Sequence, residues 1–154
     1  MTNTEPLTTE LLQKQLAQLL ETNRVDLVGQ YQQVLRETQF LNRAEVRPNM
    51  LKGIAADEAQ AFLDFLSQPA YSSQDYGSHL YQIGLSEQVL LRLGQIMRQF
   101  MLPHMVNGET AQMLGLVDRY QAGVIRGYIQ GLEKHIFTEQ ELTRQAFLRA
   151  IGQN

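Results

Sequence analysis

Apolar side chains recur along this chain at intervals of three and four residues, the spacing of one face of an α-helix. Alternation of apolar and polar residues never persists, and no Asn-Gly or Asp-Gly pair lies between β-branched runs. Prolines divide the periodic stretches into blocks, because proline does not fit inside a helix: Pro6, Pro48, Pro69 and Pro103. The pattern therefore predicts an all-α protein of about six helices.

The block boundaries predict where these helices begin and end. Helices are expected over about 9–21, 24–35, 48–68, a short segment ending at Ile83, 87–101 and 109–137. Gly84 fits a helix C-cap, and Ser86 fits the N-cap of the next helix. Thr138 and Glu141 form a capping-box pair, which predicts that the long helix breaks there. We expect one domain over 1–137, followed by an exit helix over 138–154.

Composition excludes several classes of function. The chain has 13 basic and 16 acidic residues, and the basic ones are scattered singly, so no nucleic-acid interface is expected. No apolar run reaches the roughly 18 residues of a membrane-spanning helix, so no membrane partner is expected. The chain has no cysteine, which excludes disulfides and thiolate chemistry. The polar, acidic start does not resemble a secretion signal, and a cytoplasmic protein is expected.

Motifs for catalysis and cofactor binding are missing from the sequence. No glycine-rich phosphate-binding loop occurs. The segment from Gly84 to Gln88 lacks the second glycine of a nucleophile elbow. No Glu-x-x-His pair is available for a carboxylate di-iron site. We therefore expect neither an enzyme nor a bound metal or cofactor.

Small residues and tyrosines supply the candidate contact sites. Gly123, Gly127 and Gly131 recur every four residues in the long helix, which predicts that something approaches its backbone closely. That neighbour is either a crossing helix of the same domain, or a second subunit or ligand. A second group of residues could line a pocket for a small apolar ligand or lie at the edge of the core: Tyr76, Tyr81, Tyr120 and Tyr128.

Apolar residues near the C-terminus predict self-association. The stripe of the long helix from Met113 through Ile136 is expected to be buried by the domain's own helices. Four more large apolar residues follow Thr138 and have no evident cover: Leu142, Phe147, Leu148 and Ile151. A symmetric homodimer would bury them.

Two stretches resemble a known family. The first runs from Tyr76 to Ser86 and contains an Ile-Gly-Leu turn, and the second runs from Gly127 to Ala146. Both resemble globin-like N-terminal sensor domains of bacterial signalling proteins, in particular the haem-free domains of stressosome co-antagonists that are joined to STAS domains. The resemblance implies a globin-like fold, a homodimer, and a non-catalytic regulatory function that acts on a downstream signalling domain or partner protein.

One residue separates the haem-binding and haem-free members of that family. In the haem-binding members, the proximal histidine stands four residues before the turn glycine, a position that Leu80 occupies here. His79 stands five residues before it, about 100° away around the helix. The resemblance thus favours the haem-free group. A haem-based gas sensor that uses His79 and a free-standing helical adaptor for a protein partner are the alternatives.

Overall fold

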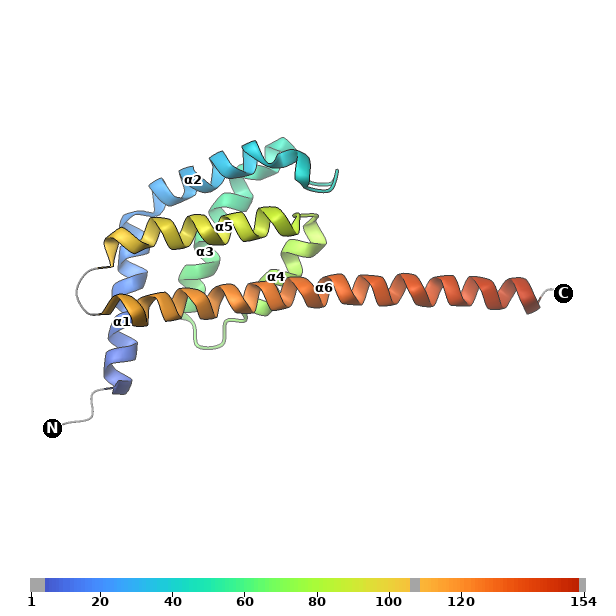
Figure 1. Cartoon of the computed structure of the whole chain (residues 1–154). Helices are drawn as coiled ribbons and strands as arrows, with labels where there is room; N and C mark the ends of the chain where they lie inside the picture. The colour runs from blue at the N-terminus through green and yellow to red at the C-terminus, as the bar shows by residue number, and fades with distance from the viewer. Residues whose placement is uncertain (1–4, 106–108, 153–154) are drawn as a thin grey trace.

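The computed structural model describes residues 5–105 and 109–152, and within them every regular element is helical. This confirms the prediction of an all-α chain with a long C-terminal helix (Figure 1). The α-helices of the described residues are α1 Glu5–Thr22, α2 Arg24–Glu37, α3 Leu51–Ser67, α4 Ser73–Ile83, α5 Glu87–Met101 and α6 Thr110–Gly152. The last two residues of the predicted exit helix, 153 and 154, lie outside the described residues.

Local sequence sets several helix ends. Pro48 opens a 3-10 turn that leads directly into α3, because its fixed φ suits a first helical turn. Gly84 ends α4 in the left-handed region, with a φ of 104°. The Ser86 hydroxyl caps α5 by accepting a hydrogen bond from the Gln88 N–H at 3.1 Å. The caps predicted at Gly84 and Ser86 are both confirmed.

The apolar core draws on α1, α2, α3, α4, α5 and the first half of α6. Its largest fully buried side chains include Tyr31 of α2, Phe62 of α3 and Tyr120 of α6. The Phe62 and Tyr120 rings lie 4.9 Å apart between centroids, so aromatic packing joins α3 to α6. These contacts hold α6 across the body of the molecule.

Helix α4 crosses α6 at a point where the two backbones nearly touch. A Cβ on Gly127 would overlap the Gln74 carbonyl group, and a Cβ on Gly77 would overlap the Val124 carbonyl oxygen. One turn earlier on α6, Gly123 faces the Ser73 side chain. The close approach to the long helix therefore occurs within one chain, at α4.

Helix α6 continues without a break past the body of the molecule (Figure 1). The break predicted at Thr138 does not occur, because the backbone hydrogen bonds of α6 run on through this residue. The Thr138 hydroxyl donates a hydrogen bond to the Lys134 carbonyl at 2.9 Å, as helical threonines can, and does not cap a new helix. The buried stripe of α6 also ends earlier than predicted. Its last buried residue is Tyr128, and Ile136 is exposed, because no other helix covers α6 there. We call residues 129–152 the arm; at 1.5 Å per residue it is about 36 Å long.

Candidate functional site

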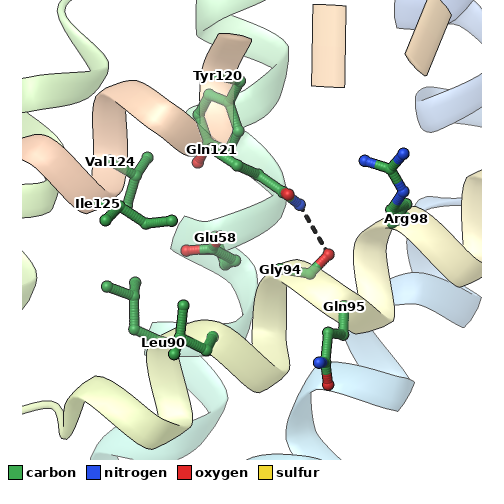
Figure 2. A pocket seen from close by; sticks show the side chains of 10 residues that line it. Glu58, Leu90, Gly94, Gln95, Arg98, Tyr120, Gln121, Val124 and Ile125 are labelled. Atoms are coloured by element: carbon green, nitrogen blue, oxygen red, sulfur yellow. Dashed lines mark hydrogen bonds between the residues drawn. The ribbon is translucent and has the colours of Figure 1, made fainter. Parts of the chain in front are cut away.

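A cleft of about 240 Å³ opens between α5 and α6 (Figure 2). Its walls are mainly apolar, and Glu58 of α3 also lines it. An apolar cavity of about 150 Å³ can hold benzene, so this cleft has room for a molecule of roughly ten non-hydrogen atoms. The lining residues that matter here are Leu90, Leu91 and Gly94 of α5, Tyr120, Val124 and Ile125 of α6, and Glu58 of α3.

Polar contacts join α5 to α6 beside the cleft. The Gln121 side-chain amide donates a hydrogen bond to the Gly94 carbonyl oxygen at 2.7 Å (Figure 2). A Cβ at position 94 would lie 3.3 Å from the Gln121 amide, so glycine lets the two helices take this spacing. Arg98 of α5 pairs with Asp118 of α6 nearby. These contacts fix the width of the cleft at one end.

Glu58 is the buried acidic group of this site and is 3% exposed. One of its oxygens, Oε2, accepts a hydrogen bond from the Tyr76 hydroxyl at 2.6 Å. Burial raises the pKa of Glu58 to about 7, although the Tyr76 hydrogen bond lowers it. Among the described residues, no basic side chain forms an ion pair with this carboxyl group.

Tyr120 brings a second buried polar atom to the same cleft. Its side chain is 1% exposed, and its hydroxyl has no hydrogen-bond partner among the described residues. Figure 2 shows the hydroxyl end of the ring directed toward Glu58, whose charge contributes to a raised pKa of Tyr120 after the larger effect of burial. Phe62 and Phe65 pack against the ring and fix its position, with centroids at 4.9 and 5.5 Å. The cleft thus holds a buried hydroxyl with unused hydrogen-bonding capacity.

The tyrosines predicted to share a pocket fall into two groups. Tyr120 lines the cleft, and Tyr76 reaches it through Glu58. Tyr81 and Tyr128 instead meet edge to face near the end of α4, with centroids 5.4 Å apart. The Tyr128 hydroxyl donates to the Leu85 carbonyl at 2.7 Å, which secures the turn after Gly84.

Sequence reasoning missed Glu58, although a signal for it was present. Leu51, Ile54, Ala55 and Phe62 form an apolar face of α3, and Glu58 stands on the same face at helical spacing. An acidic residue in such a face is unusual, because burying a charge without a partner is unfavourable. This interruption of the apolar pattern would have identified the residue.

His79 lies on the outer surface of α4, whereas its neighbour Leu80 is buried. This placement agrees with the register argument from the sequence, in which one residue rotates a side chain by about 100°. Across residues 5–105 and 109–152, no three His, Asp or Glu side chains are grouped closely enough to hold a metal ion.

The arm exposes a line of apolar side chains. A continuous helix places Ile129, Ile136, Phe147 and Ile151 within about 60° of one another around its axis. All four are exposed, from 45% for Ile136 to 64% for Phe147. We call these four residues the apolar stripe.

The other two predicted dimer residues of the arm lie off this stripe. Leu148 is rotated by about 100° from Phe147, and Leu142 by about 140°. Both are exposed. Gly131, the last glycine of the predicted row, faces Tyr81 of α4. The uninterrupted helix thus separates residues that the sequence had grouped as one candidate seam.

Comparisons with protein-family models, curated proteins and solved structures found no match to this chain. None of the helices in the described part of the chain combines the length and the apolar character that crossing a membrane requires.

Proposed function

We propose that this protein is a non-catalytic regulatory module that senses a ligand at the cleft between α5 and α6 and forms a homodimer through the arm. The observation that carries the proposal is the continuity of α6. One uninterrupted helix lines the cleft through Tyr120, Val124 and Ile125 and then extends beyond the body as the arm. A rigid helix that joins a cavity to an exposed apolar surface is suited to transmitting a change in shape.

The apolar stripe favours a second copy of this chain as the occupant of the arm. A symmetric pairing brings the same surface of each subunit together, so charges within the seam would oppose like charges. The four stripe residues are uncharged, as are Gln140 and Thr143, which fill the gap between Ile136 and Phe147. Such isolated polar residues in an apolar seam can set the register of two helices. Glu133, four residues after Ile129, lies at the edge of the same sector of the helix, so it would border the seam.

The energy available from the stripe is sufficient for association. Burying each large apolar side chain contributes about 1.5–3 kcal/mol, and a dimer has four such residues from each arm. Complete burial of these eight side chains would contribute roughly 12–24 kcal/mol, against an association cost of roughly 4–15 kcal/mol. We therefore expect a dimer at micromolar concentration.

Coupling between the cleft and the seam would pass through one turn of α6. Ile125 lines the cleft, and Ile129, the first residue of the apolar stripe, follows it four residues later. A ligand that displaces Ile125 would therefore shift the start of the paired arms. Two arrangements of the paired arms would constitute the signalling states.

The resemblance to haem-free, globin-like sensor domains supports the same function. The turn that carries the resemblance is built as expected, with Gly84 in the left-handed region and Leu80 buried. The outward position of His79 supports the haem-free type over the haem-binding one. On this proposal, the paired arms act on a downstream signalling domain or partner protein.

Sedimentation equilibrium of the full chain at micromolar concentration tests the dimer. We expect the wild-type protein to be dimeric and Phe147→Glu to be monomeric, because the substitution places two like charges in an apolar seam. Phe40→Glu is the matched control, since Phe40 is 81% exposed but lies on the body, and it should remain dimeric. A monomeric wild-type protein contradicts the proposal.

A further inference from the structure

We propose that the cleft between α5 and α6 binds a small organic amine whose ammonium group contacts Glu58 and Tyr120 and whose apolar part packs against Leu90, Val124 and Ile125. This inference rests on the proposed sensing function of the cleft and specifies the chemical class of the ligand.

The buried carboxyl group is the first support for a cationic ligand. Tyr76 is the hydrogen-bond partner of Glu58 in the described part of the chain, and it uses oxygen Oε2 only. Oxygen Oε1 has no hydrogen bond from these residues, and Glu58 belongs to the lining of the cleft. A buried carboxylate is strongly stabilised by an opposite charge that also donates hydrogen bonds to it. Arg98, the basic residue of the cleft, is already paired with Asp118.

The Tyr120 hydroxyl is the second, independent support. It is buried, has no partner among the described residues, and points toward Glu58 in the cleft (Figure 2). An ammonium group has three N–H donors, so it can satisfy both the Glu58 carboxylate and the Tyr120 oxygen. The face of an aromatic ring also attracts a cation, and Phe62 and Phe65 hold the Tyr120 ring in place.

The remainder of the cleft sets the size and character of the ligand. Leu90, Val124 and Ile125 present aliphatic walls, and a cleft of about 240 Å³ suits an aromatic or branched aliphatic group. Such a ligand has one polar end at Glu58 and no second charge, because Arg98, the other charged residue that lines the cleft, is already paired with Asp118.

The titratable groups around Glu58 predict how binding depends on pH. Burial raises the pKa of Glu58 to about 7, so its ionised fraction increases between pH 6 and pH 8. The surrounding hydroxyls have raised pKa values and stay neutral in this range: Tyr31 of α2, Tyr71 before α4, Tyr76 of α4 and Tyr120 of α6. Asp57 of α3 and Arg98 of α5 are the nearby charged groups. An aliphatic amine remains protonated throughout, so its affinity should increase roughly tenfold from pH 6 to pH 8.

The test compares three probes of similar size on the full chain labelled with nitrogen-15: 2-phenylethylamine, 2-phenylethanol and 3-phenylpropionate. Titration by NMR should place the amine's shifts in 55–62, 90–98 and 117–125. At pH 8 the amine should bind at least about tenfold more tightly than the alcohol, and the acid should bind most weakly. In Glu58→Gln, the amine should bind no more tightly than the alcohol, whose own affinity stays unchanged and reports an intact cleft. Tyr120→Phe, which keeps the ring, should weaken the amine several-fold.

The proposal is overturned if the amine does not bind, binds no more tightly than the alcohol, binds Glu58→Gln as it binds the wild type, or shifts residues elsewhere. Sedimentation of the same samples separates this result from the fate of the proposed function, because the dimer does not depend on which ligand the cleft accepts.

Discussion

At the scale of single residues, two glycines of the long helix have opposite surroundings although their sequence contexts are similar. Gly127 lies against the backbone of α4, whereas nothing approaches the position that a Cβ on Gly115 would occupy. Glycine is the least favourable residue in a helix after proline, so each reduces helix stability by roughly 0.5–1 kcal/mol relative to alanine. Of these two glycines, Gly127 is the one that a tertiary contact requires.

Substitution of the two glycines should therefore change stability in opposite directions. We expect Gly127→Ala to lower the free energy of unfolding by about 3 kcal/mol or more, since the Cβ would overlap the Gln74 carbonyl group and force α4 away from α6. Gly115→Ala should raise it by about 0.5–1 kcal/mol. Urea denaturation followed by circular dichroism measures both, and equal effects would show that the crossing is misplaced.

Glu58 should also make the stability of the protein depend on pH. Its pKa is about 7 in the folded protein, above the ordinary value of 4.5. Between these values the folded state holds a proton that the unfolded state has lost, so the free energy of unfolding falls as pH rises. From pH 5 to pH 8 the loss should be about 2–3 kcal/mol larger in the wild type than in Glu58→Gln. Matching pH profiles for the two proteins would show that the carboxyl group is not buried as described.

At the scale of elements, the continuity of α6 decides which side chains of the arm can meet a partner. A helix that runs through Thr138 aligns Ile136 with Phe147, eleven residues later, within about 20°. It turns Leu142 to nearly the opposite side. A break at Thr138 would have removed this alignment, because the two segments would rotate independently.

Charge substitutions at Ile136 and Leu142 distinguish a continuous arm from a broken one. Ile136→Glu should weaken the dimer at least tenfold, since it adds a charge to the apolar stripe. Leu142→Glu should leave the dissociation constant within about threefold, although both side chains are similarly exposed. Sedimentation equilibrium supplies the two constants, and the reverse order of effects would place the seam on the other side of the arm.

At the scale of the whole molecule, the body and the arm differ in what holds them in helical form. Residues up to Tyr128 are stabilised by packing against α3, α4 and α5, whereas the described side chains of the arm from Glu133 onward are exposed, apart from the half-buried Glu141. The ring contact between His135 and Tyr81 of α4 lies near the start of the arm. Isolated helices are marginally stable in water, so the proposed dimer would add to the stability of the arm.

Hydrogen exchange should report this difference. In Phe147→Glu, amides of the arm should exchange within seconds, while amides of α6 near Tyr120 stay protected to the level of global unfolding. In the wild-type dimer the arm should gain at least about tenfold protection. Phe40→Glu serves again as the control and should exchange as the wild type does. An arm equally protected in Phe147→Glu would mean that dimerisation does not stabilise it.

The sequence by itself determined the helical class, the number of helices, the caps at Gly84 and Ser86, and the presence of a long C-terminal helix. These features depend on periodicity and on local backbone chemistry, which act over a few residues. The different positions of Leu80 and His79 could be predicted for the same reason, because neighbouring residues of a helix point about 100° apart.

Only the tertiary structure decided what surrounds each residue. The glycine row has its close neighbour in α4, and the tyrosines separate into a cleft group and a turn group, because the crossing of α4 over α6 sets both. Glu58 is a candidate site residue because the fold brings α5 and α6 together with it around one cleft. The capping pair at Thr138 did not break the helix, because a local signal competes there with an uninterrupted backbone ladder. Local sequence patterns do not encode contacts between segments that are distant in the sequence. For this reason the helices of the body could be predicted more fully than the candidate site.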